Sequence, residues 1–112
     1  RRSSDLKEIL SPLLMECGLS HLMKKTDTEA DWSHILSLGE QQKLAFVRVF
    51  LRKPKWVFLD EATSAMDEET EEKMYRLLTA LPGTTVISIG HRSTLDKWHD
   101  RVLRIENGKL IG

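Results

Sequence analysis

The apolar residues at the start of the chain recur every three or four positions. This spacing predicts a helix with one apolar face, formed by Leu6, Ile9, Leu10, Leu13, Leu14 and Cys17. Pro12 is expected to kink this helix or to start a second one capped by Ser11, and Gly18 to end it. Cys17 lies on the apolar face, so we expect a buried structural thiol and not a reactive one.

A second apolar stretch, residues 40–52, contains no Gly or Pro and predicts a helix that is apolar on nearly all sides. The polar residues 24–33 before it predict a loop. Ser37 can cap the helix, and Gly39 allows a backbone N–H to approach a ligand closely. Such a helix start suits an anion such as phosphate, although an ordinary helix start is the commoner meaning of this pattern.

Four bulky apolar residues, 56–59, follow Pro54 and predict a buried strand of a parallel sheet. Asp60 and Glu61 come directly after it, at the strand end where parallel sheets bind ligands. One carboxylate there can hold Mg²⁺ through water, and the next can orient or deprotonate an attacking water. An acid pair that only ends a strand and caps a helix is the alternative.

The β-branched residues 84–89 predict a second buried strand, which would bring His91 to the same edge as Asp60 and Glu61. Between the strands, Asp67 or a neighbour is expected to cap a helix. The apolar stripe of this helix is Met74, Leu77, Leu78 and Leu81. The acids in its first turns are expected to form a solvated face and no metal site; they are Glu68, Glu69, Glu71 and Glu72.

The last part of the chain predicts a short helix over residues 93–98 and a strand over 101–106. Asn107 and Gly108 form a strong hairpin signal into a strand over 109–111. His21 and His99 have no predicted partner.

Four stretches, in this order, resemble the motifs of ATP-binding cassette (ABC) ATPases. Residues 36–40 (LSLGE) are similar to the signature motif LSGGQ, and residues 56–61 to the Walker B strand with its catalytic glutamate. Residues 64–67 (SAMD) resemble the D-loop, and His91 stands where the switch histidine belongs. Leu38 and Glu40 depart from the signature, replacing a Gly and the Gln. The sequences of residues 31–32 and 91–95 resemble those of the peroxisomal fatty-acyl half-transporters and their bacterial relatives.

The resemblance implies an α/β fold: part of a P-loop NTPase domain, with a mostly parallel sheet flanked by helices and part of the helical subdomain. Residues 1–35 would belong to that subdomain and a linker, and residues 36–112 to the signature helix and the later motifs. No G-x-x-x-x-G-K-[ST] phosphate loop occurs in the sequence. We therefore expect this piece alone to bind Mg-ATP poorly and to be inactive. Because the implied sheet is only partial, we also expect apolar surface to be left uncovered near Val57, Phe58, Val86 and Ile87.

The resemblance also implies ATP and Mg²⁺ as cofactors, with Asp60 serving the metal and Glu61 polarising water. His91 would contact the γ-phosphate. The nucleotide-binding residues on the signature side would be Ser37, Gly39, Glu40 and Asp67. The implied partners are a second nucleotide-binding domain, as a homodimer, and a transmembrane domain in the same or a partner chain. The implied location is the cytoplasmic face of a membrane, such as a bacterial inner membrane, with the piece itself soluble.

The composition of the chain bears on which other classes of protein it could belong to. The 112 residues suit one small domain, and 17 basic against 17 acidic residues give no electrostatic case for nucleic acid. A single Cys excludes an internal disulfide, and no apolar run approaches the ~20 residues of a membrane span. A DNA-maintenance ATPase of the SMC kind is disfavoured because residues 1–35 show no heptads. Glu61 argues against a non-catalytic binding or regulatory module for the parent protein, and that alternative stays open for the isolated piece.

Overall fold

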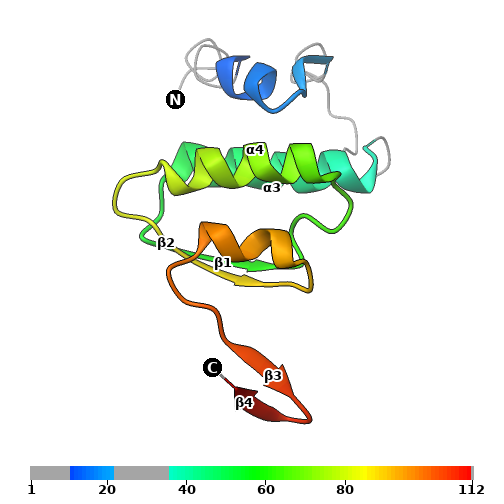
Figure 1. Cartoon of the computed structure of the whole chain (residues 1–112). Helices are drawn as coiled ribbons and strands as arrows, with labels where there is room; N and C mark the ends of the chain where they lie inside the picture. Colours follow the sequence, from blue (N-terminus) through cyan, green and yellow to red (C-terminus); the bar gives the residue numbers. More distant parts are fainter. Residues whose placement is uncertain (1–10, 22–35, 112) are drawn as a thin grey trace.

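The computed structural model describes residues 11–21 and 36–111. After a helical segment at residues 11–16, the elements are α3 (Leu38–Arg52), β1 (Trp56–Asp60), α4 (Glu68–Thr79), β2 (Thr85–Ile89), the 3₁₀ helix η2 (Ser93–Trp98), β3 (Arg104–Glu106) and β4 (Lys109–Ile111) (Figure 1). The predictions for Leu6, Ile9, Leu10 and the loop 24–33 lie outside the described residues. None of the helices within the described ranges is long and apolar enough to cross a bilayer.

Strands β1 and β2 pair in parallel, as the sequence predicts, and α3 and α4 lie over one face of the pair (Figure 1). Val57 pairs with Val86 and faces the helices, where it is buried. Phe58 pairs with Ile87 on the opposite face, and its side chain is 73% exposed. The expectation of uncovered apolar surface is therefore correct for Phe58 and Ile87. It is wrong for Val57, which the two helices cover.

Helix α3 begins with a capping box. The hydroxyl of Ser37 accepts a hydrogen bond from the Glu40 N–H, and the Glu40 carboxylate accepts one from the Ser37 N–H. These bonds start the helix at Leu38, two residues earlier than predicted. Only one face of the helix is buried, through Phe46, Val47 and Phe50. The prediction of burial on nearly all sides is wrong, because a stripe of α3 that includes Leu38, Ala45 and Arg48 stays exposed to solvent.

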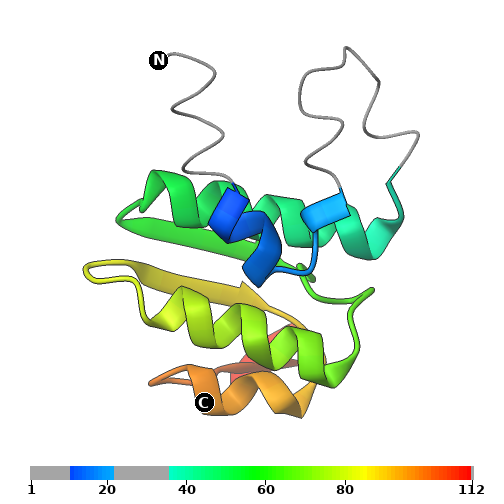
Figure 2. The same cartoon turned by 90° about the horizontal axis from the view of Figure 1, so that it is seen from above.

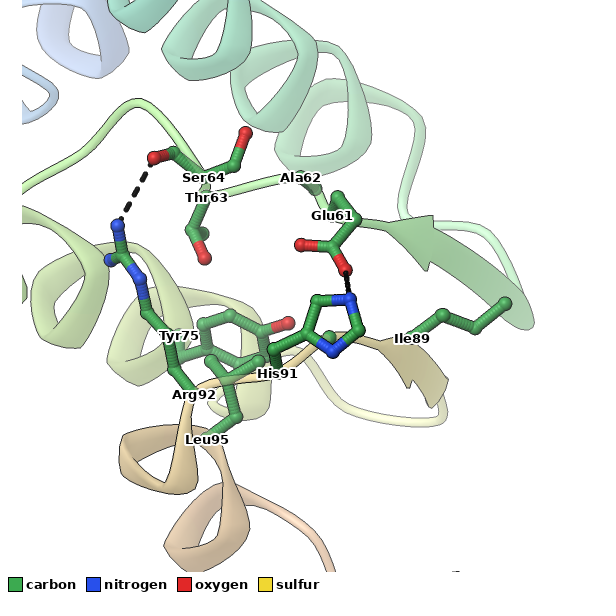
Figure 3. Close-up of a pocket in the computed structure, with 10 residues that line it drawn as sticks. Glu61, Ala62, Thr63, Ser64, Tyr75, Ile89, His91, Arg92 and Leu95 are labelled. Carbon is green, nitrogen blue, oxygen red and sulfur yellow. Dashed lines mark hydrogen bonds and ion pairs between the residues drawn. The ribbon is translucent and has the colours of Figure 1, made fainter. Parts of the chain in front are cut away.

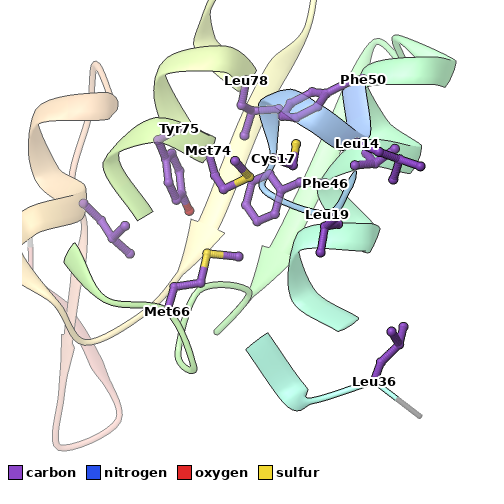
Figure 4. Packing of buried hydrophobic residues seen from close by; sticks show 12 residues of the cluster. Leu14, Cys17, Leu19, Leu36, Phe46, Phe50, Met66, Met74, Tyr75 and Leu78 are labelled. Atoms are coloured by element: carbon purple, nitrogen blue, oxygen red, sulfur yellow. The ribbon is translucent and has the colours of Figure 1, made fainter. Parts of the chain in front are cut away.

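The core lies between α3, α4 and the sheet (Figure 4). Phe46 packs its ring against Phe50 and Tyr75, at centroid distances of 6.2 and 6.0 Å. Met74 and Leu78 are fully buried, which confirms the centre of the stripe predicted for α4. Tyr75 adds a ring to this stripe and donates or accepts a hydrogen bond with Ser88 of β2 at 2.8 Å.

Residues 11–21 pack on α3 through Leu14, Cys17 and Leu19, all buried (Figures 2 and 4). Gly18 adopts φ +72° and ends the helical segment as predicted. Residues 11–16 place Pro12 inside a helix, and the predicted kink or capped start lies outside the described residues. Burial raises the pKa of the Cys17 thiol to about 11, in agreement with a structural role.

Glu71 overturns the prediction that the acids of α4 form a solvated face. Its side chain is only 2% exposed, and its carboxylate accepts three hydrogen bonds. They come from Thr63 at 2.7 Å, Thr94 at 2.6 Å and Arg92 at 3.0 Å. Glu71 lies on the same helix face as Met74 and Leu78, so it points inward, where Arg92 neutralises its charge. Glu68 and Glu69 are exposed as predicted.

The two histidines for which no partner was predicted both have one. His99 hydrogen-bonds through its two ring nitrogens to Ser88 and to the carbonyl of Leu95, each at 2.7 Å. His21 contacts the carboxylate of Glu40. Glu40 and Ser88 lie 19 and 11 residues away in other elements, so residue spacing gave no sign of these two partners.

The end of the chain is a two-stranded hairpin that extends away from the layers in Figure 1. Asn107 and Gly108 adopt φ +50° and +76°, which confirms the predicted turn. Strand β3 starts at Arg104, three residues later than predicted. All residues of β3 and β4 are exposed, so the apolar side chains of the hairpin add nothing to the core described above.

Replacement of Glu71 should destabilise the fold strongly. Glu71→Ala leaves Arg92 and two threonine hydroxyls without their acceptor, and we expect a loss of about 3–5 kcal/mol in unfolding free energy. Glu72→Ala is the matched control on the same helix, because the exposed ion pair of Glu72 with Arg76 is worth at most about 1 kcal/mol. Urea denaturation measures both, and equal effects would contradict the role given to Glu71.

Candidate functional site

Glu61 and His91 meet at the carboxyl edge of the parallel strands. Beyond the last paired residues, the Glu61 N–H donates to the Ile89 carbonyl at 2.8 Å, which keeps the turn after β1 attached to β2. The Glu61 carboxylate then lies 3.0 Å from Nε2 of His91 (Figure 3). The His91 side chain is 92% exposed, so this acid–imidazole pair is accessible to a ligand. The edge shared by the two residues is the one expected from the sequence.

The backbone of Glu61 is strained. Its φ of +53° lies in the left-handed region, which costs a residue with a Cβ roughly 1–2 kcal/mol. Strain of this kind persists where surrounding contacts hold it, and it concentrates at functional sites. The conformation turns the chain sharply at the strand end and directs the carboxylate toward His91.

Asp60 is the last residue of β1 and is exposed. Within the described parts of the chain, no group of three or more His, Cys, Asp or Glu side chains could hold a metal ion. A cation at this edge would therefore rely on one carboxylate, water and the oxygens of a ligand. Mg²⁺ binds in this manner, so the residues present fit Mg²⁺ bound together with a phosphate.

A small pocket of about 140 Å³ opens beside Glu61 and His91 (Figure 3). The turn after β1, α4, the end of β2 and η2 all contribute to its wall, through Glu61, Ala62, Thr63, Ser64, Tyr75, Ile89, Gly90, His91, Arg92 and Leu95. Arg92 donates to the Ser64 carbonyl at 3.1 Å and to Glu71 at 3.0 Å. The role of Arg92 is not visible in the sequence, because its partners lie more than 20 residues away.

Gly39 has a packing role in addition to any ligand. A Cβ at this position would lie 3.1 Å from the carbonyl oxygen of Ala65, which is closer than almost any real Cβ contact. Gly39 therefore lets the first turn of α3 pack closely against the turn that follows Glu61. The predicted anion-binding helix start and the predicted catalytic turn touch within one chain.

The acids assigned to nucleotide binding both serve as helix caps. Hydrogen bonds from the Ser37 N–H and from His21 hold the pKa of Glu40 below its usual value. Asp67 accepts the Thr70 N–H at 2.7 Å as the N-cap of α4, and its hydrogen bonds with Thr70 lower its pKa. With Glu40 engaged in this way, an anion at the start of α3 would meet the Ser37 hydroxyl and the backbone N–H groups of the first helical turn.

The parallel strands, their acid–histidine edge and the helices over one face form a partial α/β fold of the P-loop NTPase class. The profile of the ABC transporter family matches residues 3–64, and the chain belongs to this family.

Curated relatives agree with this assignment. Over 96 residues the chain is 52% identical to an uncharacterized ABC transporter ATP-binding protein of Haemophilus influenzae, covering 85% of the chain and 16% of that protein. It is 45% identical over 111 residues to the human lysosomal cobalamin transporter ABCD4, covering 95% and 18%. It is 52% identical over 79 residues to the chloroplastic ABC transporter D family member 2 of Arabidopsis thaliana, covering 70% and 11%. The chain spans less than a fifth of the length of these relatives.

Removing the Cβ of Glu61 should relieve its backbone strain. We expect Glu61→Gly to be more stable than Glu61→Ala by about 1 kcal/mol, because both lose the carboxylate and only glycine tolerates φ +53°. Lys53, with φ +46° at the end of α3, is the matched control, and Lys53→Gly should exceed Lys53→Ala by a similar amount. Thermal unfolding measures the four variants; a Glu61→Gly protein less stable than Glu61→Ala would contradict the strain.

The stability that Glu40 provides should depend on acid pH. Its pKa is lowered on folding, so its contribution is present above the unfolded value of about 4.3 and is lost as the pH falls through the folded value. In Glu40→Gln, unfolding free energy should fall less steeply than in the parent over roughly pH 5 to 3. Identical pH profiles in urea titrations would show that the carboxylate contributes nothing.

Proposed function

We propose that the protein carrying this chain hydrolyses ATP to drive transport of a substrate across a membrane. One observation carries the proposal. In a member of the ABC transporter family, the Glu61 carboxylate and the His91 imidazole lie 3.0 Å apart at the open carboxyl edge of a parallel strand pair. The family supplies ATP as the ligand, and the geometry supplies a base and a hydrogen-bonding partner at the edge where parallel sheets bind ligands.

Glu61 is the proposed base. Its side chain is 39% exposed, so a water molecule can reach the carboxylate while the backbone stays fixed by β2. The His91 ring lies beside that carboxylate and, being almost fully exposed, can donate its N–H either to Glu61 or to a phosphate oxygen. A positioned base and a fixed donor are the elements that phosphoryl transfer to water requires.

Asp60 is the proposed residue for Mg²⁺. When bound, the ion would neutralise charge on the phosphate oxygens. Asp60 is the last residue of β1, lies on the exposed face of the sheet and would hold the ion through water, which leaves Glu61 free to act on the attacking water.

The second half of the proposed ATP site comes from the start of α3. Ser37 and Gly39 would bind the γ-phosphate of the ATP held by a second copy of the domain, with Glu40 and Asp67 fixing the helix starts around it. The proposed assembly is thus a dimer of nucleotide-binding domains joined to transmembrane domains, at the cytoplasmic face of a membrane such as a bacterial inner membrane. Within it, residues 1–35 form part of the helical subdomain, and the later motifs occupy residues 36–112.

The relatives favour transport over DNA maintenance. The three described above carry transporter names, and none supports an ATPase of the SMC kind. A non-catalytic module would need no base at Glu61, so the variants below separate that alternative from the proposal.

Amide substitutions should separate Glu61 from Asp60 in the full-length protein. Glu61→Gln removes only a charge, so ATP affinity should persist while turnover falls about 10²-fold or more, the usual scale for a positioned base. Asp60→Asn should instead weaken the Mg²⁺-dependent affinity for ATP as well. Calorimetric ATP binding and phosphate release measure the two effects. Near-parent turnover in Glu61→Gln would refute the assignment of the base.

A further inference from the structure

Gln42 connects α3 to the turn that holds Glu61. Its side-chain Nε2 donates to the Glu61 carbonyl oxygen at 3.3 Å and to the Ser64 hydroxyl at 3.0 Å. Its Oε1 accepts the Ala65 N–H at 3.0 Å. Both ends of one amide are therefore used, and all three partners belong to the turn between β1 and α4.

The neighbouring Gln41 has a different hydrogen-bond partner. Among the described residues, Gln41 makes one side-chain hydrogen bond, from Nε2 to the Leu36 carbonyl at 3.2 Å, just before its own helix. Two adjacent residues of the same type and the same helix thus differ in their partners. Gln41 bonds to the start of α3, whereas Gln42 reaches across to the turn 61–65.

The contacts of Gln42 fall where the backbone is strained. Glu61 has φ +53°, and its N–H is held by the Ile89 carbonyl of β2. Gln42 of α3 holds the Glu61 carbonyl, and the close approach of Gly39 to Ala65 keeps α3 against the same turn. A left-handed residue needs such surrounding contacts to persist.

We propose that Gln42 is a positioning residue: its amide fixes the Glu61 backbone on α3, so that the Glu61 carboxylate points at the attacking water. This inference rests on the proposed ATP hydrolysis. It also links two sites, because Gln42 stands one helical turn after the Ser37 cap. A displacement of the helix start by a phosphate bound there is passed on to the base of the same chain.

Steady-state ATP hydrolysis by the full-length protein tests the proposal. Gln42→Ala should lower kcat about ten- to hundredfold, the scale of a misplaced catalytic group, and leave KM for ATP unchanged. Gln42→Glu should do the same. It keeps the acceptor for Ala65 and can accept from the Ser64 hydroxyl, but it repels the Glu61 carbonyl oxygen. Gln41→Ala is the matched control and should keep the parent kcat. Parent-like kcat in Gln42→Ala or Gln42→Glu would overturn the proposal.

A double-mutant cycle distinguishes positioning from general damage. If Gln42 acts through Glu61, adding Gln42→Ala to Glu61→Gln should change single-turnover hydrolysis less than twofold, because the group it positions is already lost. A further loss of tenfold or more would overturn the positioning role. Hydrolysis that does not depend on Glu61 would instead refute the proposed function. Failure of the positioning role and failure of the proposed function are therefore distinguishable.

Discussion

The buried carboxylate of Glu71 is the constraint on which the arrangement of the site depends. One side chain on α4 accepts hydrogen bonds from Thr63, Thr94 and Arg92, which belong to the turn after β1 and to the segment after His91. Arg92 extends this network to the Ser64 carbonyl. An unpartnered charge at this depth would cost several kcal/mol, so the two segments cannot separate without breaking the network. By holding these two segments at a fixed distance from each other, the network brings Glu61 and His91 together.

The parallel register supplies the second constraint. Because Asp60 pairs with Ile89, both strands end at the same level, and the residues that follow them emerge at one edge. The helices cover the side of Val57 and Val86, whereas Trp56, Phe58, Ile87 and Ile89 leave an apolar face exposed. An apolar face of this kind is typical of an interaction surface. The site therefore lies at the carboxyl edge of the strand pair, next to the face that the helices cover.

The sequence predicted the local features well and the long-range contacts poorly. Caps, strands and the hairpin turn follow from a few adjacent residues, so Ser37, Asp67 and Asn107 could be read directly. Arg92 and Gln42 act on partners about 20 or more residues away, and no local pattern shows those contacts. Glu71 is different, because it precedes Met74 and Leu78 by three and seven positions and shares their helical face. Its burial could have been predicted had periodicity been given more weight than the surrounding acids.

The Glu71–Arg92 ion pair and the Glu61–His91 pair differ in exposure, and the difference suits them to different roles. In the Glu71–Arg92 pair the carboxylate is 2% exposed, and in the Glu61–His91 pair it is 39% exposed. Water screens the exposed pair, so exchanging His91 for a water partner costs the Glu61 carboxylate little free energy. The Glu71 carboxylate has no such exchange, since without Arg92 its charge would remain buried and unpaired. Rigid support from one pair thus allows the other to change partners, which is the property that a reacting carboxylate requires.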